Sequence, residues 1–282
     1  MTDAIDRVRP LLAAGLLAGL LVVSAVAVPL VANARPAREI PVEEVDQALA
    51  EPTADGWSEV PAADLALASA PSGVPNAGDT NVGVIHVQAA RGDDHLYLRL
   101  RWQDPTANRN ASSPRQFVDT VAVEFPVNAS TRPAIAMGSK GNLVNLWYWS
   151  PVTTQELLAG GPGTTTTFAQ PAIDTAATRT TVDGKPGWSV VFARELSTSA
   201  DNRTDLTVNA DASVAFAVWD GANFERAGRK AVSEWYYFPF GPEPAGAPFQ
   251  TLLWAIAGIA IALVIAVTAV SVRRAREGGG DQ

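Results

Sequence analysis

The sequence contains no cysteine among its 282 residues. This absence excludes disulfides, thiolate zinc sites, iron–sulfur clusters held by this chain, thiol nucleophiles and covalently attached c-type haem. Histidine is nearly absent as well, because His86 and His95 are the only two. A metal site built from several histidines is therefore excluded too.

Lysine and methionine are also scarce. Most of the basic residues are arginines, and the three lysines are Lys140, Lys185 and Lys230. Apart from Met1, the one methionine is Met137, in "RPAIAMGSKGNLVNLWYW". A methionine is usually core filler, and a lysine in a glycine-containing loop is usually a surface residue. Composition alone favours these ordinary roles for both.

No enzyme motif emerges from the sequence. There is no glycine-rich phosphate loop and no nucleophile elbow, and the carboxylates are scattered along the chain. Asp104 and Asp119 follow or sit inside predicted strands, where loop capping is the favoured role. Without the termini, 16 of the 21 basic and 25 of the 29 acidic residues remain, and the resulting net charge of −9 argues against nucleic-acid binding.

Two uncharged apolar runs, Leu11 to Ala34 and Phe249 to Val270, bracket the chain. Each is long enough to cross a hydrocarbon core of about 30 Å. The first run fits either a cleaved signal peptide or an uncleaved anchor. Arginines lie before the first run and after the second, which predicts that both termini are in the cytoplasm if the first run is uncleaved. The part of the chain between the two runs is then expected to be exported.

This organisation predicts five parts. Residues 1–34 are a signal peptide or signal anchor, 35–54 a linker and 55–245 the folded domain; 249–272 form a transmembrane helix and 273–282 a cytoplasmic tail. Within the linker, Val42–Ala50 is expected to form a short helix. The segment Ala159–Gln170, rich in glycine and threonine, is expected to be an exposed loop.

Strand signals dominate the folded domain. Alternating or apolar stretches bounded by turn residues occur at Val82–Ala90, His95–Trp102, Phe117–Val127 and Asn142–Ser150, and Asp183-Gly184 marks a hairpin turn. No long amphipathic helix appears. The predicted fold is all-β, an antiparallel β-sandwich.

Two aromatic clusters, at Trp147–Trp149 and Trp235–Tyr237, allow two interpretations. Alternate residues of a strand face inward, which favours core packing. The functional alternative makes Trp147 and Trp235 part of the wall of a pocket for a flat ligand. Exposed aromatic residues and acidic loops would also suit a surface-anchored carbohydrate-binding module.

Six segments in the same order resemble a known family. They are "GWSEVPAADLAL", "VIHVQAARGDDHLYLRLRWQDPTAN", "FVDTVAVEFP", "AMGSKGNLVNLWYW", "GWSVVFARELS" and "VAFAVWDGANFERAGRKAVSEW", and they span about Gly56 to Phe238. They resemble the haem b (gamma) subunits of exported type II molybdoenzymes of the dimethyl-sulfoxide-reductase family, such as the gamma subunit of ethylbenzene dehydrogenase. The C-terminal membrane span departs from those subunits, which are typically soluble after export.

The resemblance implies that Met137 and Lys230 are the axial ligands of the iron of one haem b. The residue inventory agrees, because a chain without cysteine and with only two histidines has few other strong ligand pairs. An amine binds a metal only when it is neutral, so Lys230 must lose its proton. Arginine cannot replace it, since a guanidinium stays protonated.

The resemblance also implies a role and partners. With both axial positions filled by protein, the haem would carry electrons and perform no bond chemistry. The expected complex contains a molybdopterin alpha subunit and an iron–sulfur beta subunit. Electrons would pass between the iron–sulfur subunit, this haem and a membrane quinol system or an extracytoplasmic redox carrier.

Overall fold

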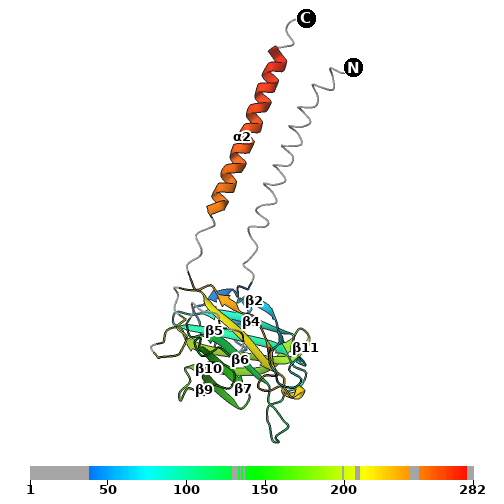
Figure 1. The fold of residues 1–282 in the computed structure, drawn as a ribbon, viewed down its shortest axis with the longest axis vertical. Coiled ribbons are helices and arrows are strands. Elements are labelled where there is room, and N and C mark those ends of the chain that lie inside the picture. The colour runs from blue at the N-terminus through cyan, green and yellow to red at the C-terminus, as the bar shows by residue number, and fades with distance from the viewer. Residues whose placement is uncertain are drawn as a thin grey trace. The chain divides into compact units, whose positions relative to one another are not determined.

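The computed structural model describes residues 38–128, 133, 135, 137–198, 200–206, 210–241 and 248–277. Its strands belong to one compact unit within Ala37–Pro242. Helix α2 (Pro248–Glu277), orange to red in Figure 1, belongs to a second unit. The predicted signal peptide or anchor, 1–34, lies outside the described residues.

The first sheet has six strands in the order β1-β4-β5-β11-β10, and β2 also pairs with β4. Their bounds are β1 Val42–Glu44, β2 Ala62–Ala66, β4 Val84–Arg91, β5 His95–Gln103, β10 Ile173–Val182 and β11 Lys185–Glu195. A short 3-10 helix, η1 (Asp55–Ser58), precedes β2. Strand β1 runs parallel to β4, so the sheet is not wholly antiparallel as predicted.

The second sheet has eight strands in the order β3-β13-β12-β6-β7-β8-β9, with β14 pairing with β12. Their bounds are β3 Ala68–Ser69, β6 Thr120–Pro126, β7 Val144–Ser150, β8 Thr153–Ala159, β9 Thr166–Thr167, β12 Ala212–Trp219, β13 Ala231–Val232 and β14 Tyr236–Phe238. A 3-10 helix, η2 (Gly221–Asn223), follows β12. Strand β9 lies inside the segment that was expected to be an irregular exposed loop.

The alternation of strand residues explains how the sheets pack. In β5, the residues Leu96, Leu98, Leu100 and Trp102 share one face and are all buried, as the period-2 pattern predicts. The hairpin between β10 and β11 turns on Asp183 and Gly184, both with positive φ. This geometry belongs to the two-residue hairpin turn that an Asp-Gly pair favours.

The two sheets pack face to face around a shared apolar core. The first sheet contributes residues such as Leu98 and Phe192, and the second contributes Val123, Phe125 and Trp147. The predicted β-sandwich is therefore confirmed at the level of two packed sheets, mostly antiparallel.

The segment before β2 covers the outer face of the first sheet, away from the shared core. Leu49 and Trp57 are fully buried there, against Tyr97 and Val191. The helix expected at Val42–Ala50 is absent, and strand β1 occupies part of that range. The pairing of β1 with β4 overrides the weak helical propensity of the segment.

Helix α2 is apolar and long enough to cross a membrane over Ile256–Arg273, and no residue of this window is buried among the described residues. It exposes large apolar side chains, including Trp254, Ile259, Leu263 and Ile265. Such a surface is unfavourable in water, so the helix fits a membrane anchor.

Candidate functional site

The outer face of the second sheet, opposite the shared core, forms the floor of a cavity of about 620 Å³. Strands β6, β7 and β12 place alternate residues on this face: Ala122, Glu124, Tyr148, Ala217 and Trp219. Their neighbours in sequence, such as Val123 and Trp147, point into the shared core instead. We call this space the outer-face cavity; its volume is in the range of cofactor sites.

Loops form the remaining wall of the outer-face cavity. They come from the segment after β3, the approaches to β6 and β7, the β8–β9 connection and the segment between η2 and β13. Two of these loops deliver Met137 and Lys230, so both predicted ligand residues line the same cavity.

The backbone of Lys230 is fixed on both sides. Its carbonyl oxygen accepts a hydrogen bond from the Ala70 amide at 2.9 Å, and β13 begins at the next residue. The ammonium nitrogen lies 4.9 Å from the centre of the Trp219 ring. Among the described residues it has no hydrogen-bond or ion-pair partner within 4 Å. Burial lowers the pKa of Lys230, and the nearby Glu124 opposes that shift.

Met137 lies at the start of a tight turn. Its φ of 64° is in the left-handed region, which is uncommon for a residue with a long side chain. The turn is closed by paired backbone hydrogen bonds between Ser139 and Asn142, and the Gly161 amide donates to the Met137 carbonyl. The side chain packs against Val144 and lines the outer-face cavity.

Glu124 is the acidic residue of the cavity floor. Its Oε1 atom is buried and has no hydrogen-bond partner among the described residues. Burial raises the pKa of Glu124 from 4.5 to about 7, while the neighbouring Lys230 acts in the opposite direction. Sequence pattern alone does not single out Glu124, because nothing in the order of the chain shows that β6 faces the loop of Lys230.

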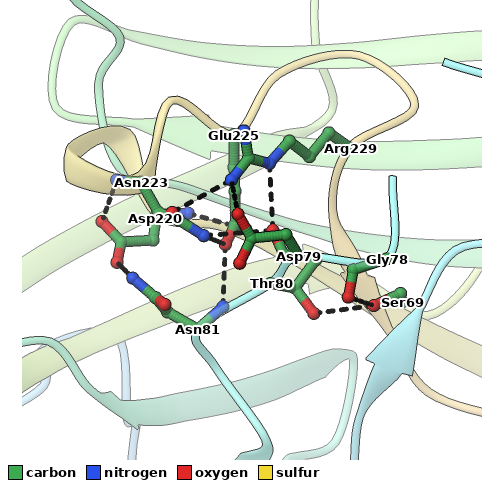
Figure 2. A network of polar contacts seen from close by, with 9 residues as sticks. All are labelled: Ser69, Gly78, Asp79, Thr80, Asn81, Asp220, Asn223, Glu225 and Arg229. Carbon is green, nitrogen blue, oxygen red and sulfur yellow. Dashed lines mark hydrogen bonds and ion pairs between the residues drawn. The ribbon is translucent and has the colours of Figure 1, made fainter. Parts of the chain in front are cut away.

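A polar network holds the loop between β12 and Lys230 (Figure 2). The buried Glu225 carboxylate accepts hydrogen bonds from the amides of Asn81 and Asp220 and from the Asn223 side chain, at 2.9, 3.1 and 3.0 Å. Asn81 also donates to Asp220 at 2.7 Å. These contacts tie the loop to the segment before β4, which is distant in sequence.

Arg229, next to Lys230, belongs to the same network. It donates to the Asp79 carboxylate at 2.6 Å, to the Asp79 carbonyl at 2.9 Å and to Asn223 at 3.0 Å (Figure 2). The two adjacent cations therefore have different surroundings. Arg229 is ion-paired, whereas Lys230 lines the cavity and has no ion pair among the described residues.

Three buried carboxylates, Asp104, Asp119 and Asp220, have oxygens within 4.8 Å of one another. The protein supplies donors to each of them. Thr106 donates to Asp104, Asn108 and Gly221 donate to Asp119, and Asp220 caps η2. Burial, with the Asp104 charge, raises the pKa of Asp119 to about 7. The predicted capping role of Asp104 and Asp119 is confirmed by these contacts.

The two tryptophans considered for a pocket wall do not line the outer-face cavity. Trp147 is fully buried in the shared core, 4.6 Å between ring centres from Phe125. Trp235 is partly buried and donates to the Pro133 carbonyl at 2.8 Å. Tyr148 and Trp219 line the cavity instead. Period-2 alternation could have found Tyr148, since it must face away from Trp147 and Trp149.

Fold and site together define a two-sheet β protein whose second sheet carries a cofactor-sized cavity, with a thioether and an amine on its wall. The family described as ethylbenzene dehydrogenase matches residues 54–182 and 174–231. The chain belongs to this family, and the resemblance found in its motifs is confirmed.

Three curated relatives agree with this assignment. A Haloferax mediterranei protein, provisionally named as a respiratory nitrate reductase heme subunit, is 49% identical over 90% of each chain. The chlorate reductase gamma subunit of Ideonella dechloratans is 34% identical over 68% of this chain and 80% of its own. The dimethylsulfide dehydrogenase gamma subunit of Rhodovulum sulfidophilum is 29% identical over 68% of this chain and 76% of its own.

Among solved structures, a family 9 carbohydrate-binding module of Caldicellulosiruptor kristjanssonii in complex with glucose aligns with 73% of this chain and 98% of its own. The TM-score is 0.40 and the identity is 13%. A likeness of this size says nothing about sugar binding by the present chain.

Proposed function

We propose that this chain is the electron-transfer subunit of an extracytoplasmic molybdoenzyme complex and binds one haem b in the outer-face cavity. Met137 and Lys230 are its axial ligands. The observation that carries the proposal is that both residues, far apart in sequence, line one cavity of suitable volume. The relatives named as a heme subunit and as gamma subunits support it.

The residues present fit a haem. The floor offers small side chains, Ala122 and Ala217, beside the rings of Tyr148 and Trp219, and this suits a flat apolar ligand. The Lys230 amine lacks a hydrogen-bond or ion-pair partner among the described residues, and its lowered pKa eases the loss of the proton that ligation requires. When bound, the haem supplies one-electron chemistry.

Within this proposal the protein performs no bond chemistry. Lys230 and Met137 would hold the iron of the haem, which would leave no position for a substrate. Glu124 lines the same cavity, and its negative charge opposes the lowering of the Lys230 pKa, while burial raises the pKa of Glu124 itself to about 7.

The complex would join this subunit to a molybdopterin alpha subunit and an iron–sulfur beta subunit, with a quinol system or an extracytoplasmic carrier at the other end of the path. Helix α2 anchors the assembly, residues 273–282 lie in the cytoplasm, and the β unit lies outside. Because the chain lacks cysteine, single cysteines at Lys185 and at Gln282 would report these sides by impermeant thiol labelling. Equal labelling of both in intact cells contradicts the topology.

Reconstitution of the full chain with haem b in detergent tests the ligand assignment. Wild type should give a Soret band that shifts on reduction and a low-spin spectrum. Lys230→Arg keeps the charge but cannot ligate, and Met137→Leu keeps the volume but loses the thioether, so each should lose the low-spin signature. Lys185→Arg, at an exposed position, is the matched control. A colourless wild type, or unchanged spectra in both variants, would refute the proposal.

A further inference from the structure

A second, smaller hollow of about 460 Å³ adjoins the outer-face cavity. The two share four wall residues: Val74, Phe117, Arg226 and Ala227. The hollow lies at the surface, since its wall includes the exposed side chain of Phe224. We call it the arginine hollow, because Arg115, Arg226 and Arg229 contribute to its wall.

The three arginines are not equivalent. Arg229 is committed to Asp79 and Asn223 (Figure 2). Arg226 and Arg115 are exposed, and among the described residues neither guanidinium has a hydrogen-bond acceptor or an acidic partner. The hollow therefore holds positive charge that no acidic side chain in the described part of the chain neutralises.

Arg226 has a geometry suited to binding an anion. Its guanidinium carbon lies 4.7 Å from the centre of the Phe117 ring. A guanidinium stacked on a ring is oriented by that contact, while the N–H donors in its plane stay available for a carboxylate. Paired N–H donors of this kind match carboxylate oxygens in a bidentate arrangement.

Haem b is amphiphilic, with an apolar macrocycle and propionate carboxylates on one edge. An apolar cavity suits the macrocycle, but a carboxylate buried there without a partner would be strongly unfavourable. Arg226 stands where the apolar space meets the solvent-facing hollow.

We propose that the arginine hollow is the carboxylate subsite for the haem propionates, with Arg226 as its main donor and Arg115 as the second. This inference rests on the proposed function. It orients the ligand, because the propionate edge then faces the surface near Phe224 while the rest of the ring lies between Met137 and Lys230.

The test compares two ligands that differ only in their carboxylates, haem b and its dimethyl ester. The full chain, purified without cofactor in detergent, is titrated with each, and binding is followed by the Soret band. Wild type should bind haem b about tenfold or more tightly than the ester, as expected for a charge-assisted hydrogen bond. Arg226→Gln should reduce that ratio to about one by weakening haem b alone.

Arg91→Gln is the matched control, since Arg91 also lies over a phenylalanine ring, that of Phe240, at 5.8 Å and does not line either space. It should leave the ratio unchanged. A wild-type ratio near one, or the same ratio in wild type and Arg226→Gln, overturns the subsite. If wild type and Arg226→Gln show the same ratio, and the variant binds an acidic partner subunit more weakly, the arginines would be assigned to protein docking. If neither ligand gives a Soret band, the haem assignment itself fails.

Discussion

The outer faces of the two sheets carry the same pair of groups, a cation above a tryptophan, in different settings. On the first sheet, the guanidinium of Arg99 lies 4.8 Å from the Trp57 ring centre. On the second sheet, the ammonium of Lys230 lies 4.9 Å from the Trp219 ring centre. The first pair sits under a packed cover, and the second borders the outer-face cavity.

The two cations differ in their hydrogen bonding. Arg99 donates to Gln88 at 2.8 Å and to the Pro52 carbonyl at 3.1 Å, which stabilises its buried charge. Lys230 has no such acceptor among the described residues. A buried cation without acceptors is destabilising unless it is neutralised or bound. The difference separates a structural contact on the first sheet from the place on the second sheet where we propose that a ligand binds.

The largest expected difference concerns the two tryptophans. Trp57→Ala should cost about 3–5 kcal/mol of unfolding free energy, because the ring is fully buried under the cover. Trp219→Ala should cost about 1 kcal/mol, since one side of that ring already borders open space. Urea unfolding of cofactor-free full chain, followed by circular dichroism, measures both. Equal losses would mean that the two outer faces are packed alike.

A smaller, pH-dependent difference concerns Glu124. The pKa is about 7 in the folded protein against 4.5 as the ordinary value, so the folded state binds the extra proton. This contribution to stability is full below about pH 4.5 and is lost as the pH rises through 7. Glu124→Gln should therefore be more stable than wild type at pH 8, on the order of 2–3 kcal/mol, and equal to it near pH 4.

The control for Glu124→Gln is Glu156→Gln, a buried carboxylate that already has an ion pair with Arg203 at 2.9 Å. This variant should lose stability at pH 8, because the change removes the carboxylate that pairs with Arg203 and leaves the guanidinium without it. A Glu124→Gln variant that follows the wild-type pH profile would show that the carboxylate is solvated.

The sequence predicted the strands well where one face alone is buried, as in β5, because alternation then marks the faces. It also singled out Met137 and Lys230 through the family motifs, and the structure places them in one cavity, while their role as ligands stays a prediction. Local pattern did not predict the cover over the first sheet, because the burial of Leu49 depends on a strand pairing with a distant segment.

The position of the cavity could have been inferred in part. The sequence of β6, "TVAVEFP", is apolar at most positions, which indicates that both faces of this strand are covered. Small residues at alternate positions, Ala215 and Ala217 in β12, leave room on one of those faces. Which loops close that room, and hence the proximity of Glu124 to Lys230, follows only from the tertiary fold.

The smallest expected effect on stability comes from an alanine-to-leucine substitution, made once on the outer face of each sheet. Ala90 is fully buried beneath the cover of the first sheet, so Ala90→Leu should overpack it and cost about 1–3 kcal/mol. Ala217 faces the outer-face cavity, where an added leucine finds room, and Ala217→Leu should change stability by less than about 0.5 kcal/mol.

The same Ala217→Leu variant separates stability from binding. By occupying the cavity floor it should reduce haem uptake in the reconstitution assay while the protein remains as stable as wild type. Ala177→Leu, at an exposed position of β10, should alter neither quantity. If Ala217→Leu bound haem normally, the ligand would have to lie away from the β12 floor. If it were as destabilising as Ala90→Leu, the cavity would be smaller than its walls indicate.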